Sequence, residues 1–159
     1  MIPTDHYLDY AAGYLELGLL DEASEELELI EGEDRLSAEV MRLRCRLYSA
    51  AKNWELLLAV SKHLAILKPA EPAAWLLWGR ALRKLERVEE AREVLLEAME
   101  LHPMCARLHF HLACCDSLLG YLHSARIRAA AASEMDPALK GSILSDPDLN
   151  AIWENMPTE

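Results

Sequence analysis

Apolar and polar positions along this chain follow a helical rhythm that recurs with a fixed period. Between residues 75 and 98, large apolar residues and small residues return at intervals of three or four, which is the spacing of one helix face. Pro69, Pro103 and Pro137 are each 34 residues apart, and each follows a helical run that a proline would end. The pattern therefore predicts pairs of helices that repeat every 34 residues.

Turn signals fall where each predicted pair should bend, at Gly18 to Asp21, Lys52-Asn53, Glu86-Arg87 and Gly120. Ser37 and Asn53 are predicted N-caps, because their side chains can accept a hydrogen bond from the first helical turn. Small residues at Gly79, Ala91 and Ala98 would let the two helices of one pair approach closely. We thus expect antiparallel hairpins of helices.

The segment that ends at Pro103 resembles the tetratricopeptide repeat (TPR). It reads Trp75-x-x-Trp78-Gly79-x-x-Leu82 and continues with Ala91, Leu95 and Ala98, with large apolar substitutes at three pattern positions. The other three segments match the pattern less completely, and the likeness covers roughly residues 4–137. It implies an all-α, right-handed superhelical solenoid of helix-turn-helix repeats.

The likeness also implies a single TPR domain over residues 1–159, with repeats near 4–37, 38–71, 72–105 and 106–139 and a C-terminal cap over 140–157. Several positions depart from the pattern, and three of them carry a charged residue. Arg35 replaces the closing proline of the first repeat, and Asp116 stands where the pattern has Tyr. Arg44 falls on a face that the family buries, so either its stem crosses the core to an acid such as Glu22 or Glu26, or the register slips locally.

Apolar residues continue after Pro137, at Leu139, Ile143, Leu144, Leu149, Ile152 and Trp153. A solenoid needs such a segment, because an uncapped end would leave an apolar patch in water. We interpret this tail as one or two short capping helices, with mimicry of a bound peptide as the alternative.

Composition agrees with a helical globular chain, since 52% of its 159 residues are hydrophobic and Ala, Leu, Glu and Arg dominate. Residues 1–14 lack a basic segment followed by an apolar one, and the chain has no run of about 18 apolar residues. We therefore expect a cytoplasmic protein without a membrane partner. Reduced, buried thiols are expected for Cys45, Cys105, Cys114 and Cys115.

Charge is unevenly distributed along the chain, whose net charge is -11. Residues 1–35 carry eleven acids and one base, residues 36–135 carry eleven acids and fourteen bases, and residues 136–159 carry five acids and one base. A mildly basic centre thus lies between acidic ends. Such a chain is a poor partner for nucleic acid.

In the TPR family the first helices of successive repeats line a concave groove, so the resemblance implies where a partner would bind. Among the positions that face this groove, those predicted to bind the partner include several cations and are Arg42, Arg46, Leu76, Arg80, Arg83, Lys84, Arg107, Phe110 and His111. Arg46 and Arg80 occupy equivalent positions, so we expect them about one helix spacing, near 10 Å, apart. Arginines bind carboxylates through paired hydrogen bonds, which favours an acidic or C-terminal peptide. The alternative is a solvated basic face without a ligand.

Candidates for chemistry are few. Cys105 with His109, and His111 with Cys115, have the spacing of metal ligands on one helix face, but the two pairs point in different directions and cysteine is commonly buried as an apolar residue. The chain has no glycine-rich phosphate loop and no nucleophile or zinc-protease motif. We therefore predict no enzyme, no metal and no cofactor.

The sequence as a whole predicts a protein–protein interaction scaffold that holds an acidic segment of a partner. A type III secretion-like TPR chaperone for a secreted protein is the alternative, because such chaperones resemble this chain in size, acidity and repeat number. A metal sensor or enzyme built on Cys105, His109, His111 and Cys115 is a third reading. Homo-oligomerisation is left open.

Overall fold

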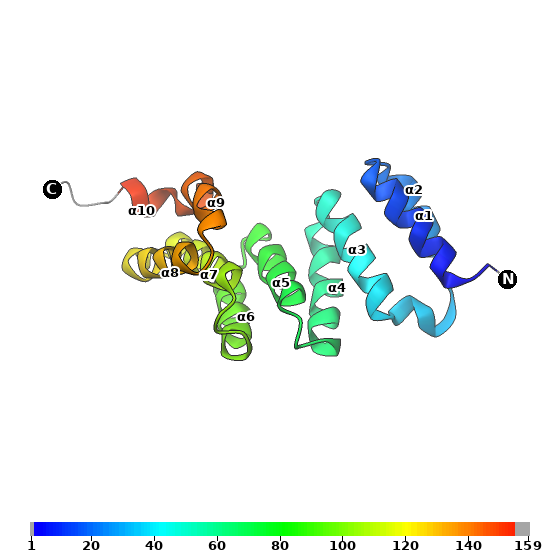
Figure 1. Ribbon diagram of the computed structural model, residues 1–159, viewed down its shortest axis with the longest axis horizontal. Helices are drawn as coiled ribbons and strands as arrows, with labels where there is room; N and C mark the ends of the chain where they lie inside the picture. The colour runs from blue at the N-terminus through cyan, green and yellow to red at the C-terminus, as the bar shows by residue number, and fades with distance from the viewer. Residues whose placement is uncertain (1, 155–159) are drawn as a thin grey trace. The chain divides into compact units, whose positions relative to one another are not determined.

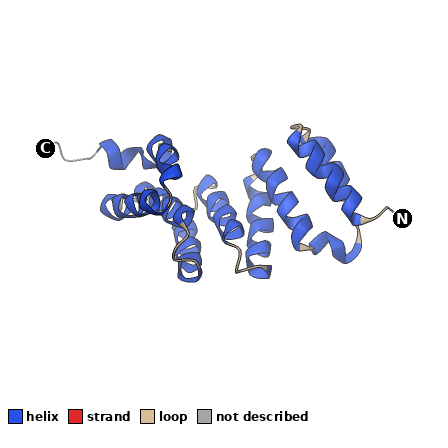
Figure 2. Cartoon of the chain, in the orientation of Figure 1, coloured by secondary structure: helices blue, strands red, loops and turns tan. Residues whose placement is uncertain are grey.

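The structure is a computed structural model that describes residues 2–154. Over this range the chain forms ten α-helices and three short 3-10 helices, and it contains no strand (Figure 2). The all-α prediction is therefore confirmed. The chain divides into two compact units, residues 1–69 and residues 70–159, which are described separately.

Unit 1 contains two helix pairs (Figure 1). The first is α1 (Thr4–Glu16) with α2 (Leu20–Glu28), and the second is α3 (Ala38–Ala50) with α4 (Trp54–Leu67). The 3-10 helix η1 (Gly32–Leu36) joins the two pairs. The core of unit 1 contains Ala11, Ala23, Leu27, Ile30, Val40, Leu43 and Leu47.

Unit 2 contains two further pairs and a C-terminal segment. The pairs are α5 (Pro72–Lys84) with α6 (Val88–Leu101), and α7 (Ala106–Leu118) with α8 (Leu122–Met135). The segment consists of η2 (Pro137–Leu139), α9 (Lys140–Ser145), η3 (Pro147–Leu149) and α10 (Asn150–Glu154). It packs against α7 and α8.

The turn inside each helix pair has the same geometry, with a left-handed residue at the same position of the period. The φ angles are 74° at Gly18, 55° at Lys52, 62° at Glu86 and 85° at Gly120. In each turn the amide that follows this residue donates to a carbonyl five residues earlier, for example Leu19 N–H to Tyr14 O at 2.8 Å. This is the Schellman helix ending. The four predicted turns are confirmed, spaced 34 residues apart.

Both predicted N-caps are confirmed. The Ser37 hydroxyl accepts a hydrogen bond from Val40 N–H at 3.3 Å, and the Asn53 side chain accepts one from Leu56 N–H at 3.3 Å. These side chains satisfy amide groups that the first helical turn leaves without an intrahelical acceptor. They fix the starts of α3 and α4.

The small residues of the third pair allow close packing of α5 on α6. A Cβ atom at Gly79 would lie 2.7 Å from a methyl carbon of Leu95, closer than two carbon atoms can approach. Ala91 and Ala98 are fully buried on the facing helix. These small residues thus allow the close approach of the two helices, as the sequence pattern predicts.

The first pair ends differently from the others. Helix α2 has 9 residues, whereas α4, α6 and α8 have 14 each. The three longer helices each end two residues before a proline, at Pro69, Pro103 and Pro137, while η1 takes the place of the missing turn and contains Arg35. The loss of the closing proline therefore coincides with a shortened second helix.

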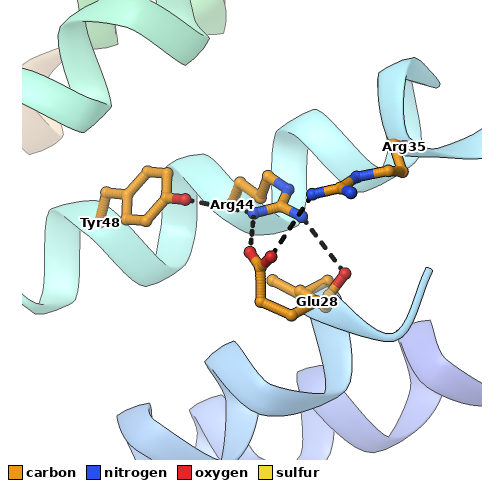
Figure 3. Close-up of polar contacts among 5 residues, drawn as sticks. Glu28, Arg35, Arg44 and Tyr48 are labelled. Carbon is orange, nitrogen blue, oxygen red and sulfur yellow. Dashed lines mark hydrogen bonds and ion pairs between the residues drawn. The ribbon is translucent and has the colours of Figure 1, made fainter. Parts of the chain in front are cut away.

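Arg44 reaches a different acid from the two that the sequence suggested. Its guanidinium forms an ion pair with Glu28 at 3.0 Å, and donates to the carbonyl of Leu27 at 3.2 Å and to the Tyr48 hydroxyl at 3.2 Å (Figure 3). The prediction of Glu22 or Glu26 was wrong, because α2 ends at Glu28 and its last carbonyls need donors. Arg35 pairs with the same carboxylate at 3.4 Å.

Asp116 is a fully buried carboxylate that links three helices of unit 2. It accepts hydrogen bonds from Arg92 Nε on α6 at 2.6 Å, from Arg128 Nε on α8 at 2.9 Å and from the Ser124 hydroxyl at 2.6 Å. A buried charge is tolerated when it is paired and hydrogen-bonded in this way. The departure from tyrosine is therefore compensated by two arginines and a serine.

The C-terminal segment covers the apolar surface of α7 and α8. Ile143, Leu149 and Ile152 are at most 3% exposed. They join a cluster with Phe110, Ala113, Cys114, Ala125, Ala129 and Ala132. The predicted capping role is confirmed for the described part of this segment, because without it these residues would face water.

Candidate functional site

A cleft of about 460 Å³ opens in unit 2 beside α5, α7 and η3, and we call it the basic cleft. Its lining combines three cations of α5, one histidine of α7 and the acidic turn that leads into α10: Arg80, Arg83, Lys84, His111, Asp146, Pro147 and Asp148. Four of the sequence-predicted partner residues thus come together at one place. The two acids were not among those predictions.

The cations of the basic cleft come from one face of α5. Arg80 lies three residues before Arg83 and four before Lys84, and such spacings place side chains beside one another on a helix. Basic side chains in the last turn of a helix are also favoured by the carbonyl groups that point from its end. Helix geometry alone therefore gathers these charges.

Arg83 has a buried side chain at the cleft. Its side chain is 8% exposed, and its Nε atom lies 3.2 Å from Oδ2 of Asp148, which is 30% exposed. The pair lacks the geometry of a hydrogen bond, so Nε and Nη1 of Arg83 have no acceptor among the described residues. A buried donor without an acceptor costs roughly 1–3 kcal/mol, and more when it is charged. The guanidinium is therefore neutralised but incompletely hydrogen-bonded.

The pKa of His111 reflects the burial of this side chain and the charges around it. Burial, together with the charges of Arg83, Arg80 and Arg107, lowers the pKa of His111 to about 3. Its Nδ1 atom is buried and has no hydrogen-bond partner in the described part of the chain. The imidazole is therefore neutral at pH 7, and its surroundings oppose a further positive charge.

The remaining predicted residues of unit 2 lie around this cleft. Arg107 is exposed one helical turn before His111 on α7, and Leu76 is half-buried one turn before Arg80 on α5. Phe110 is 9% exposed and belongs to the cluster under the C-terminal segment, with its ring centroid 5.6 Å from that of His111. Phe110 thus belongs to the apolar core next to His111 and does not line the cleft itself.

Arg42 and Arg46 lie on α3 of unit 1. Arg42 is half-buried and Arg46 is exposed. Because α3 and α5 belong to different units, the expected spacing of Arg46 and Arg80 stays a prediction.

Sequence reasoning missed Asp146 and Asp148 as site residues because they lie more than 60 positions after Arg83 in the chain. One signal was present. The C-terminal residues 136–159 are acidic while the centre of the chain is basic, so complementary charge could have suggested a contact. Which acid meets which cation depends on the fold of the tail.

Among the described residues, the cysteine and histidine pairs considered as metal ligands do not form a group of three or more with ligand atoms within 4.8 Å of one another. His109 Nε2 lies 3.1 Å from the carbonyl of Pro103, and Cys115 is fully buried, where burial raises the pKa of its thiol to about 11. A different group, Cys114 with Asp146 and Asp148, has potential ligand atoms within 4.8 Å of one another. Burial raises the pKa of the Cys114 thiol, and Arg83 already neutralises Asp148, so both features disfavour a metal cation there.

Solved structures of other proteins share this architecture. No protein-family model and no curated protein matches the sequence. Among solved structures, the TPR protein TTC0263 of Thermus thermophilus is 21% identical and superposes with a TM-score of 0.73, covering 96% of this chain and 80% of that chain. This chain has the tetratricopeptide repeat fold.

Two further TPR-like neighbours carry the name MamA. MamA from Desulfovibrio magneticus RS-1 is 18% identical with a TM-score of 0.74, covering 95% of this chain and 89% of that chain. MamA AMB-1 is 16% identical with a TM-score of 0.71, covering 95% and 81%. At these identities the similarity shows the TPR fold alone. It carries no information about the residues that line the basic cleft of this chain. Within residues 2–154, no helix is long and apolar enough to cross a membrane.

Proposed function

We propose that this TPR chain is a protein-binding module whose basic cleft holds an acidic segment of a partner protein. The observation that carries the proposal is Arg83, whose side chain is almost completely buried at the cleft and which has no hydrogen-bond acceptor for two of its nitrogen atoms among residues 2–154. A carboxylate oxygen is the acceptor that suits it best, because guanidinium and carboxylate form short, charge-assisted pairs.

The electrostatics of the cleft support an anionic ligand. Burial is the main cause of the lowered pKa of His111, and the positive charges of Arg83, Arg80 and Arg107 add to it, which supports a positive potential around this side chain. The same potential would lower the free energy of a bound carboxylate. A peptide is favoured over nucleic acid, because residues 1–35 carry a net charge of -10 and would repel a phosphate backbone.

The test uses the full chain and a fluorescein-labelled peptide of six consecutive aspartates, with binding measured by fluorescence anisotropy. Arg83→Gln with Lys84→Gln should weaken binding at least tenfold, because the change removes two cations of the cleft. Lys84→Gln with Arg107→Gln provides a second variant at two exposed positions, which removes the charge without touching the buried guanidinium. Helicity measured by circular dichroism should be unchanged in both.

The matched control is Lys52→Gln with Lys68→Gln, which removes the same charge from two exposed positions of unit 1. It should bind like the wild type. Equal weakening by this control would mean that net charge alone drives binding, and would overturn the cleft as the site. Unchanged binding by both cleft variants, or no saturable binding by any of the proteins, would overturn the proposal as well.

The type III secretion-like chaperone role stays a prediction, and so do the cytoplasmic location and the absence of enzymatic activity. The acidic-segment proposal is the more specific one, since it names the side chains that would make the contact.

A further inference from the structure

The acidic turn 146–148 of this chain already occupies part of the basic cleft. Asp148 approaches Arg83 to 3.2 Å, and Pro147 lies between two acids that line the cleft. An aspartate that meets a buried arginine is the contact that the proposed function assigns to a partner. The tail therefore places a ligand-like group at the site from within the same chain.

The contact between Asp148 and Arg83 is incomplete. It provides opposite charge but no hydrogen bond of good geometry, and Nε and Nη1 of the guanidinium have no acceptor in the described residues. A carboxylate free to orient itself could accept from two guanidinium nitrogens at once. A partner carboxylate could therefore satisfy Arg83 better than Asp148 does.

The turn is anchored on both sides by buried apolar residues. Ile143 before it and Leu149 after it are buried in the cluster with Ala113 and Cys114. Between these anchors, the Asp146 carboxylate accepts from the Asp148 N–H at 2.9 Å and so caps η3. The Asp148 side chain can leave Arg83 while both anchors and the cap stay in place.

We propose that the 146–148 turn is a built-in occupant of the basic cleft, and that an acidic partner segment displaces the Asp148 carboxylate from Arg83. This inference rests on the proposed function, and it adds competition to it. The contact of Asp148 with Arg83 weakens the binding of a partner, and removal of this contact strengthens it. The tail thereby acts both as the cap of the solenoid and as an internal competitor.

The two acids of the turn allow a matched experiment. Asp148→Asn removes the charge that meets Arg83, whereas Asp146→Asn removes the same charge from the same cleft and retains the cap, since asparagine is as good a cap as aspartate. Binding of the six-aspartate peptide should tighten at least threefold in Asp148→Asn. Asp146→Asn should change it less than twofold.

A peptide with the sequence of residues 142–150 provides a second measurement. It should compete with the labelled peptide for the Asp148→Asn protein, and the same peptide with asparagine at position 148 should not. Competition by both peptides alike would contradict a specific role of the Asp148 carboxylate.

The outcomes separate this inference from the proposed function. If no variant binds the six-aspartate peptide, the proposed function itself fails. If the wild type and Asp148→Asn bind it equally, or if both substitutions tighten it to the same extent, the cleft is a binding site without an internal competitor. Weaker binding by Asp148→Asn would assign Asp148 to positioning Arg83 and would also overturn the inference.

Discussion

Two polar residues of α7, Asp116 and His111, show how single side chains shape unit 2. Asp116 gathers Arg92, Arg128 and Ser124 around one carboxylate, whereas His111 stays neutral among arginines. The first group is satisfied and stabilises the packing of three helices. The second has no partner for Nδ1 in the part of the chain that the structure describes, and it lies at the cleft. Asp116 therefore contributes to the packing of unit 2, whereas His111 belongs to the candidate binding site.

Replacing Asp116 with asparagine should strongly destabilise the protein. The substitution removes the charge that compensates two arginines, which are 31% and 22% exposed, and we expect a loss of about 3 kcal/mol in the free energy of unfolding. Urea unfolding at pH 7 measures this change. Asp136→Asn is the control, because asparagine retains the cap of η2 and should change stability by less than about 0.5 kcal/mol.

His111 should make the protein sensitive to acid. Its folded pKa of about 3 lies below its ordinary value of 6.5, so the unfolded chain takes up the proton first as the pH falls. The stability is fully present above pH 6.5 and is lost progressively between that pH and about pH 3. Between pH 7 and pH 5 the loss from this residue should be about 2 kcal/mol.

The measurement is urea unfolding at both pH values for the wild type and for His111→Gln, which has no titrating side chain at this position. The difference between pH 7 and pH 5 should shrink in the variant. Equal losses in the two proteins would assign the acid sensitivity to other groups.

At the scale of elements, the helix pairs are defined by their turns. Each pair places one residue in the left-handed region, and this residue is glycine in the first and fourth pairs but lysine or glutamate in the second and third. A residue with a Cβ atom pays a conformational cost of about 1 kcal/mol or more in that region. The two middle turns are therefore less favourable than the outer two.

Lys52→Gly and Glu86→Gly should each raise the free energy of unfolding by roughly 0.5–1 kcal/mol, because glycine adopts this φ without strain. Gly18→Ala and Gly120→Ala should lower it by about 1 kcal/mol, and no neighbour lies within 4 Å of the added Cβ, so the effect is one of backbone conformation. Chemical denaturation measures all four. Ala51→Gly, at a residue with φ of -76°, should destabilise, and a gain there would contradict this explanation.

At the scale of the whole molecule, each compact unit has its own buried core, and the acidic and basic charges are concentrated in different parts of the chain. In unit 2 the C-terminal segment closes the apolar surface of α7 and α8 and also supplies the acids of the basic cleft. Stability and the proposed binding site are thereby linked through the same short segment.

Leu149→Ala should test the contribution of the C-terminal segment to stability. Leu149 is fully buried in the cluster of α7 and α8, and truncation of such a side chain typically costs about 2–5 kcal/mol. Leu144→Ala is the control, because Leu144 is 64% exposed in the same segment and its loss should cost less than about 0.5 kcal/mol. Equal unfolding midpoints for the two variants would show that the segment does not stabilise unit 2.

The sequence by itself determined the features that depend on neighbouring residues. The 34-residue period, the four turns, the caps at Ser37 and Asn53 and the close approach at Gly79 follow from local conformation and side-chain size, and the structure confirms them. The helical character and the TPR fold were predictable for the same reason. The shortened α2 was signalled only by the absence of a closing proline.

Tertiary structure alone decided which charges meet. Arg44 pairs with Glu28 because α2 ends there, and Asp116 finds its two arginines on the helices that pack on either side. Asp148 reaches Arg83 across 65 positions of sequence because Ile143 and Leu149 seat the tail on α7 and α8. Ion pairs depend on distances of a few ångströms, and only the packing of apolar side chains sets those distances.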